Sequence, residues 1–360
     1  MKIIHCSDLH LDSQMQSNLS KEKAKERNNE ILITFQNMVK YAKENLVKII
    51  IIAGDLFDRK NISVKTKNIV KFAIEDNPEI DFIYLKGNHD NTRFIEDDEI
   101  PSNLKLFSKY EWIKYEYENN LVITGREIEG RNDIDIYNSL NLNKQDVNIV
   151  VMHGQESQID IKDKTEIINL KELKNKNIDY LALGHIHSYK QEKLDKRGIY
   201  CYSGCLEGRG FDECGKKGFV LLDVENGKIE SKFIEFAQRE VRELHIDISD
   251  TVTTSEVESK ISDKLKDIDQ KNLVKIILEG KVDIQSERDI NYLLKRFETD
   301  VYYLKIYDET TLKINYMDYK NDVSLKGEFI RMVLEQDLTD EEKKEIITTG
   351  IKALSGEEVD

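Results

Sequence analysis

Five short apolar runs within residues 1–190 each end in polar residues of the kinds that bind metal ions. The runs are KIIHCSDLH, VKIIIIAGDLFD, DFIYLKGNHD, VNIVVMHGQ and DYLALGHIH. Helical patterns lie between them, so the order strand, helix, strand predicts parallel strands. In sheets of this kind, ligand sites gather beyond the carboxyl ends of the strands. The sequence therefore predicts an α/β domain in which five strand ends converge on one site.

Most of the histidines stand at these strand ends. The chain has 7 histidines, and five follow the apolar runs directly: His10, His89, His153, His185 and His187. A single histidine in such a place is more often a hydrogen-bonded structural residue. Five of them, accompanied by Asp8, Asp55 and Asn88, instead favour a metal centre. Nitrogen and oxygen ligands without sulfur suit Mn, Fe or Zn.

The spacing within the runs suggests how the ligands are arranged. Because a strand alternates its faces with a period of two, Cys6, Asp8 and His10 are expected on one face and His5 on the other. Asp55 follows the most hydrophobic run, which predicts the central strand. Its two carboxylate oxygens make it the expected bridge between two ions about 3.5 to 4 Å apart.

Composition narrows the class of protein. The formal net charge is -15, so a nucleic-acid ligand needs a local basic patch or metal ions. The 4 cysteines show no CxxC spacing, which favours structural thiols in a reducing compartment. The longest apolar run, residues 49–53, is too short to cross a bilayer. We therefore expect a soluble cytoplasmic protein without a membrane partner.

The chain is long enough for more than one domain. Residues 200–236 are rich in short strands and glycine turns, so we expect the first domain to span residues 1–237. Residues 238–312 follow the order β-α-β-α-β, which predicts a small α/β cap. Residues 313–360 contain two expected helices that either pack on the cap or bind a partner. Two pairs have the spacing of helix-capping boxes, Ser255 with Glu258 and Thr339 with Glu342.

The motifs DLH, GDLFD, GNHD, MHG and GHIH, in this order, resemble the calcineurin-like metallophosphoesterases. Within that superfamily the chain is similar to the bacterial SbcD-type DNA repair nucleases, the counterparts of the Mre nucleases. The segments HCSDLHLDS and GCLEGRGFDECGKKGF are most similar to the YhaO-like branch. The resemblance implies a two-sheet αββα sandwich with a small α/β cap domain and C-terminal helices. It covers the first domain by motif, the cap by element order and the last helices loosely.

The resemblance also implies a ligand set for two divalent ions, expected to be Mn²⁺, with Fe or Zn as alternatives. One ion would be held by Asp8, His10, Asp55 and His187, and the other by Asp55, Asn88, His153 and His185. His89 is then left as the expected general acid for a departing oxygen. Asp90 would orient it or, alternatively, cap the next turn.

Further residues are candidates for the surroundings of the centre. Arg209 could contact a phosphate of DNA and Phe211 a base, although the GRGF segment also fits a surface turn. Arg93, close to GNHD, has the same status. Asp58 stands where archaeal and eukaryotic members usually have histidine and bacterial members commonly share the aspartate. It also fits a solvated turn or a helix cap.

Three functions fit these observations. The first is a DNA exo- and endonuclease that works with an SMC-like coiled-coil ATPase of the SbcC type. Its docking face would comprise Phe329, Ile330, Val333 and Leu334, unless these residues pack on the cap. The second is a phosphatase or small-molecule phosphodiesterase, because the same motifs serve all such substrates. The third is a catalytically dormant scaffold that binds DNA ends. The sequence leaves open whether the chain forms a homodimer.

Overall fold

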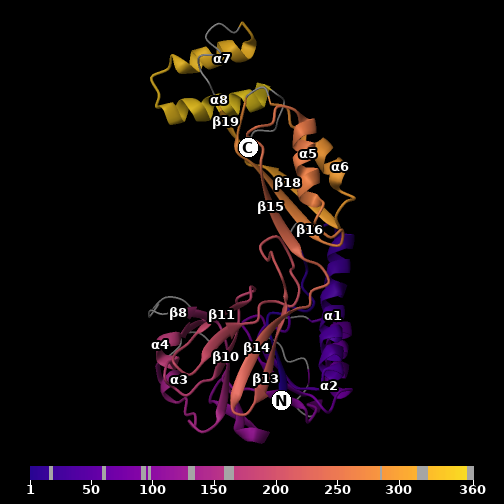
Figure 1. Cartoon of the computed structure of the whole chain (residues 1–360), viewed down its shortest axis with the longest axis vertical. Coiled ribbons are helices and arrows are strands. Elements are labelled where there is room, and N and C mark those ends of the chain that lie inside the picture. The colour runs from indigo at the N-terminus through magenta and orange to yellow at the C-terminus, as the bar shows by residue number, and fades with distance from the viewer. Residues whose placement is uncertain are drawn as a thin grey trace. The chain divides into compact units, whose positions relative to one another are not determined.

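The computed structural model describes residues 1–15, 19–58, 62–90, 95, 99–128, 134–157, 166–283, 286–313 and 323–354. The chain divides into two compact units, Met1–Val241 and Arg242–Asp360. The sequence predicted a finer division, with boundaries at residues 237 and 312. Figure 1 shows the elements of both units.

Two six-stranded sheets form the first unit. The first sheet has the order β14-β13-β1-β2-β3-β4, and the second has the order β11-β12-β10-β7-β6-β5. The first contains β1 (Lys2–Cys6), β2 (Val47–Ala53), β3 (Asp81–Leu85), β4 (Leu104–Leu106), β13 (Gly218–Glu225) and β14 (Lys228–Glu235). The second contains β5 (Ile113–Tyr117), β6 (Leu121–Gly125), β7 (Val147–His153), β10 (Tyr180–Gly184), β11 (Lys190–Lys193) and β12 (Ile199–Tyr202). In each sheet the central strands are parallel, as predicted.

Helices cover the outer face of each sheet (Figure 1). On the first sheet lie α1 (Lys21–Glu44) and α2 (Val64–Glu75), and on the second lie α3 (Ile134–Asn138) and α4 (Leu170–Leu173). The remaining short elements of this unit are the 3-10 turn η2 (Glu118–Asn120) and the paired strands β8 (Gln155–Ser157) and β9 (Ile167–Asn169). Ser20 and Ser63 cap α1 and α2 by accepting backbone N–H groups of their first turns.

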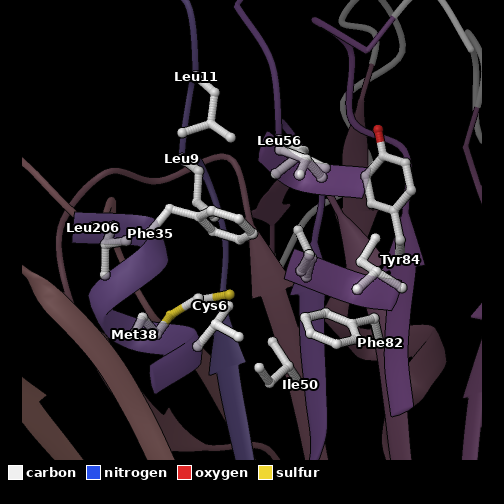
Figure 2. Packing of buried hydrophobic residues seen from close by; sticks show 14 of the residues in the cluster. Cys6, Leu9, Leu11, Phe35, Met38, Ile50, Leu56, Phe82, Tyr84 and Leu206 are labelled. Atoms are coloured by element: carbon white, nitrogen blue, oxygen red, sulfur yellow. The ribbon is translucent and has the colours of Figure 1, made fainter. Parts of the chain in front are cut away.

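Alternation of side chains along the strands produces the layers. On β2, Ile49 and Ile51 point toward the second sheet, and Ile50 points toward the helices. Figure 2 shows Phe35 and Met38 of α1 packed beside Ile50 and Cys6. Because every central strand is apolar on both faces, each sheet must be covered on both sides. The predicted αββα sandwich is confirmed.

A buried ionic cluster fixes α1 to the segments around residues 207 and 239. Arg27 is fully buried, and its Nη2 donates to Glu207 Oε2 at 3.1 Å and to the Gly208 carbonyl at 2.7 Å. It also forms an ion pair with Glu30, which accepts from Arg239 Nε at 2.9 Å. Each charge in this cluster therefore depends on its partner for solvation.

An Arg27→Met variant is expected to lower the free energy of unfolding by about 3 to 5 kcal/mol, because it leaves Glu207 buried without its cation. Urea denaturation of the whole chain measures this loss. The control is Lys40→Met, since Lys40 pairs with Glu44 on the exposed side of the same helix. The control should change the free energy of unfolding by about 0.5 kcal/mol or less. Equal effects of the two substitutions would contradict the prediction.

The second unit has the predicted order β-α-β-α-β. Its three-stranded sheet, β15-β16-β18, contains β15 (Val241–Asp247), β16 (Leu273–Glu279) and β18 (Tyr303–Asp308). The other elements are α5 (Thr254–Leu265), α6 (Ile290–Phe297) and the paired strands β17 (Lys281–Asp283) and β19 (Thr311–Lys313). The capping box of α5 is formed by Thr253 and Glu256, two residues earlier than the sequence indicated. Thr339 and Glu342 pair as predicted.

Two further helices complete this unit, α7 (Leu325–Leu334) and α8 (Asp340–Leu354). Ile330 and Val333 of α7 are buried in the same hydrophobic cluster as the strands of the cap, and Phe329 and Leu334 pack against that cluster. The interpretation of these four residues as a docking face is therefore wrong, and the alternative of packing within the unit holds. Within the described part of the chain, no helix combines the length and the apolar character needed to cross a membrane.

Candidate metal centre

The ends of five strands supply the polar residues of the predicted site. Asp8 and His10 follow β1, Asp55 follows β2 and Asn88 follows β3, while His153 ends β7 and His185 and His187 follow β10. A continuous chain of short contacts joins all seven side chains. Both sheets therefore contribute to one cluster, because the carboxyl ends of their parallel strands meet at the same edge of the sandwich.

Left-handed backbone conformations aim the ligands into the cluster. The φ angles are 52° at Asp8, 45° at His10, 51° at Asp55 and 103° at His185, a region that residues with side chains seldom adopt. β1 ends at Cys6, whose side chain packs on the helix side of the sheet. The sequence argument that Asp8 and His10 continue the face of Cys6 is thus wrong, because strand alternation stops before Asp8.

Hydrogen bonds hold these irregular loops in place. The N–H of Asp8 donates to the Gly54 carbonyl and that of His10 to the Asp55 carbonyl, each at 3.0 Å. The Asp8 carboxylate accepts the backbone N–H of His185 at 2.9 and 3.0 Å. The bond from Asp8 to Gly54 joins neighbouring loops of the first sheet. The bond from His185 to Asp8 connects the second sheet to the first.

Two motif glycines allow the loops to approach each other. A Cβ atom at Gly54 would lie 2.1 Å from Nδ1 of His153, and one at Gly87 would lie 2.2 Å from Oδ1 of Asp55. Gly54 also has a φ of 95°, which disfavours any other residue. The glycines of GDLFD and GNHD are therefore required by close packing around the ligands.

The first half of the cluster brings two imidazole nitrogens face to face. Nε2 of His10 lies 3.2 Å from Nε2 of His187. Carboxylate oxygens stand beside them, with Asp55 Oδ2 3.9 Å from the His10 nitrogen and Asp8 Oδ1 3.9 Å from the His187 nitrogen. Two nitrogens and two carboxylates around one point form a donor set that fits a divalent cation.

The second half of the cluster is centred on His153. Its Nε2 lies 3.0 Å from Asn88 Oδ1 and 3.3 Å from Asp55 Oδ2, while its Nδ1 faces the Ala53 carbonyl at 2.9 Å. The ring of His185 packs edge-on against that of His153, with centroids 5.4 Å apart. Because Asp55 contacts both halves, it has the position of a bridge between two ions.

The buried carboxylates of the cluster are stabilised by positive charge. Burial would raise the pKa of Asp55, but His153 and His10 outweigh burial and hold the pKa well below its usual range. Burial would likewise lower the pKa of His153, but the hydrogen bond and charge of Asp55 raise it to about 9. A proton on His153 thus compensates the buried carboxylates when no metal ion does.

His89 and Asp90 occupy different environments. The side chain of His89 is 45% exposed, Nδ1 lies 3.7 Å from Asp58 Oδ1, and its backbone N–H donates to Asp55 Oδ1 at 2.8 Å. Asp90 is buried, and its carboxylate accepts the backbone N–H groups of Leu56, Phe57 and Gly87. Asp90 thus holds the turn that begins at Gly87 and the loop after β2, whereas the turn after Asp90, which the alternative concerned, lies outside the described residues. Asp58 lies where it can orient His89.

The three residues considered for DNA contacts differ in their surroundings. Arg209 is directed toward carboxylates, donating to Asp58 Oδ1 at 3.1 Å and to Glu213 Oε1 at 2.7 Å. Phe211 is half-buried in the same loop, and its carbonyl accepts from Cys214 Sγ at 3.2 Å. Arg93 lies outside the described residues.

Comparison with known proteins gives the family. The model of the calcineurin-like phosphoesterase family matches residues 1–189, just over half of the chain and every strand end of the cluster. The chain belongs to this family. The resemblance inferred from the five motifs is thereby confirmed, and the chain is a hydrolase of the metallophosphoesterase superfamily, whose members use divalent metal ions.

Three curated relatives of this phosphoesterase are similar along most of its length. The DNA double-strand break repair protein Mre11 of Saccharolobus solfataricus is 26% identical over 389 residues, which cover 100% of this chain and 96% of the relative. The corresponding protein of Sulfolobus acidocaldarius is 26% identical over 93% of this chain and 86% of its own. The uncharacterized metallophosphoesterase YhaO of Bacillus subtilis is 26% identical over 78% of this chain and 72% of its own.

Sequence reasoning missed Glu213, which lies beside this phosphoesterase centre. Glu213 is buried, and its Oε1 lies 2.7 Å from Nδ1 of His187. It follows no apolar run, so the pattern of ligands at strand ends could not have revealed it. The one signal was its place in the segment GCLEGRGFDECGKKGF, which the family resemblance had singled out.

Proposed function

We propose that this phosphoesterase is a DNA exo- and endonuclease that hydrolyses phosphodiester bonds during DNA repair. The observation that carries the proposal is the similarity to an Mre11 repair protein over 100% of this chain, second unit included. The second unit argues against a minimal small-molecule phosphoesterase, since it is a further module beside the catalytic one. The relatives named Mre11 and the shared family fold support DNA as the substrate.

The residues of the cluster are suited to two divalent ions, most simply Mn²⁺. In this proposal Asp8, His10, Asp55 and His187 hold one ion, and Asp55, Asn88, His153 and His185 hold the other. Such ions supply positive charge to the phosphoryl oxygens and make a water molecule more acidic. Nδ1 of His153 donates to the Ala53 carbonyl, which leaves Nε2 as the ligand atom.

His89 is the proposed general acid. Its side chain is exposed beside the cluster, and Asp55 anchors its backbone N–H. From there the imidazole can donate a proton to the sugar oxygen that departs from phosphorus. Asp58, 3.7 Å from Nδ1 of His89, can stabilise the protonated ring.

An SMC-like coiled-coil ATPase of the SbcC type is the proposed partner. Exposed apolar side chains remain on the two C-terminal helices, including Leu325, Met332 and Ile346. The net charge of -15 disfavours tight DNA binding by this chain alone, so a partner would contribute affinity. A Met332→Glu variant that is still retained by such an ATPase as strongly as the wild type would contradict this docking face.

The proposed activity is tested with four substrates in the presence of Mn²⁺: linear duplex DNA, single-stranded DNA, a phosphomonoester and a cyclic nucleotide. We expect cleavage of DNA and little turnover of the two small esters. Hydrolysis of the small esters alone would instead establish a phosphatase or small-molecule phosphodiesterase. Metal binding without any hydrolysis would favour the dormant scaffold.

A further inference from the structure

A carboxylate stands behind each of the two imidazoles that face one another in the first half of the cluster. Oε1 of Glu213 lies 2.7 Å from Nδ1 of His187. Oδ1 of Asp58 lies 3.2 Å from Nδ1 of His10, a close contact of charge and ring, although among the described residues this nitrogen has no hydrogen-bond partner. The carboxylates are therefore on the opposite side of each ring from the Nε2 atoms that meet at the centre.

Arg209 joins these two carboxylates into one unit. Its Nη1 donates to Asp58 Oδ1 at 3.1 Å, and its Nη2 and Nε donate to Glu213 Oε1 at 2.7 and 3.0 Å. Its backbone N–H donates to Glu213 Oε2 at 2.7 Å, and Nη2 also lies 3.3 Å from Nδ1 of His187. A guanidinium is always charged, so it keeps the buried Glu213 and the partly exposed Asp58 in place as acceptors.

The loop that carries this unit is attached to the backbone of His187 without any help from the cluster. The buried Lys217 donates from Nζ to the His187 carbonyl at 2.7 Å, and the N–H of Cys205 donates to the same oxygen at 3.3 Å. The ring of His187 is thus held between its own strand end and the loop.

Glu213 decides which nitrogen of the His187 ring carries the proton. A neutral imidazole has a single N–H, and it lies on the nitrogen that faces an acceptor. The carboxylate at Nδ1 leaves Nε2 of His187 as a lone pair, 3.2 Å from Nε2 of His10. Asp8 Oδ1 lies 3.9 Å from the same His187 nitrogen, so this lone pair is available to a cation.

We infer that Glu213, Arg209 and Asp58 form a positioning unit that fixes the Nδ1–H tautomer of His187 and so prepares its Nε2 to bind a divalent ion. The inference rests on the proposed function only in treating the cluster as a metal centre. It replaces the phosphate contact considered for Arg209 with a role inside the protein.

The test uses metal-free protein labelled with ¹⁵N-histidine. Nitrogen chemical shifts distinguish the two tautomers, so no activity is needed. The wild type should show the Nδ1–H form for His187. In Glu213→Gln, His187 should become a mixture of tautomers, because an amide can also donate to Nδ1. In Asp58→Ala, a substitution at a partly exposed side chain, His187 should change less, because Glu213 remains while Arg209 loses one of its two carboxylates.

Titration with Mn²⁺ gives a second measurement. Loss of a partner that holds a metal-binding histidine typically weakens metal binding about 10- to 100-fold, and we expect that range for both variants. The control is Glu207→Gln, because Glu207 is equally buried in the same loop but pairs with Arg27. It should lower stability while leaving the tautomers and the Kd for Mn²⁺ unchanged.

Two results would separate the possible failures. If Glu213→Gln and Asp58→Ala keep wild-type tautomers and bind Mn²⁺ as tightly as the wild type, the positioning unit is wrong and the metal centre stands. If the wild type itself binds no Mn²⁺, the metal centre and the proposed function are wrong. Weakened binding in Glu207→Gln to the same degree would also overturn the inference, since the effect would then belong to the whole loop.

Discussion

An Asp55→Asn variant is expected to lose high-affinity binding of both metal ions and with it phosphodiester hydrolysis. Asp55 contacts His10 in one half of the cluster and His153 in the other. An amide has no charge and offers one oxygen, so it can no longer bridge two cations. Metal ions contribute several kcal/mol to such reactions. The rate should therefore fall on the order of 10³-fold or more, since each 1.36 kcal/mol is a factor of ten.

Asparagine is the suitable replacement because it separates ligand loss from misfolding. Asp55 has a φ of 51°, a conformation that asparagine tolerates better than alanine. The amide oxygen can still accept the backbone N–H of His89, which Asp55 accepts at 2.8 Å. The variant should therefore fold, and its thermal midpoint without metal should remain measurable.

Titration calorimetry and thermal unfolding with Mn²⁺ measure the effect. Mn²⁺ should raise the unfolding midpoint of the wild type and have much less effect on Asp55→Asn, because only a bound ion stabilises the native state. Asp12→Asn is the matched control, since Asp12 has a φ of 69° and accepts the N–H of Ser63 outside the ligand set. Binding of two ions by Asp55→Asn with wild-type affinity would rule out the bridging role.

The sequence was sufficient to predict the convergence of ligands on one edge, and the family resemblance implied the sandwich. The convergence follows from local patterns, since apolar runs form parallel strands and residues after such strands share an edge. His153 and His185 come from different runs but meet with ring centroids 5.4 Å apart because β7 and β10 are neighbours in one sheet. The runs predicted each strand and the residues at its end, but not which strands are neighbours.

Local patterns could not predict the contacts that depend on loops. β1 stops at Cys6, and the left-handed turns at Asp8 and His10 are stabilised by partners in the loop after β2. Asp90 accepts N–H groups from the loop around Leu56, more than thirty residues away. Glu213 reaches His187 in the same way. Such pairs are long-range and follow no period, so a single sequence contains no physical signal for them.

The C-terminal helices show a second limit of what a sequence can predict. Amphipathic spacing correctly predicted that α7 has an apolar face, but the spacing does not say what covers it. Ile330 and Val333 are buried within the second unit. Because a face that packs internally and a face that binds a partner have the same sequence pattern, only the folded structure distinguishes them.

A His89→Ala variant is expected to keep the metal ions and lose turnover, whereas Asp55→Asn should lose both. His89 is exposed beside the cluster, and its contact with Asp55 is made by the backbone N–H, which alanine retains. A general acid contributes about 10²- to 10⁴-fold to the rate, so kcat for DNA should fall in that range. The Kd for Mn²⁺ should stay within about twofold of the wild type, since no ligand is removed.

The leaving group provides the decisive measurement. A nitrophenyl phosphodiester releases an oxygen that needs no proton, whereas the sugar oxygen of DNA does. His89→Ala should therefore slow DNA cleavage far more than release of nitrophenolate. His245→Ala is the control, because His245 is an exposed histidine of the second unit that pairs with Glu243 and Glu279. If His89→Ala slowed both substrates equally, or lost Mn²⁺ as Asp55→Asn should, His89 would act on the metal centre instead of on the leaving oxygen.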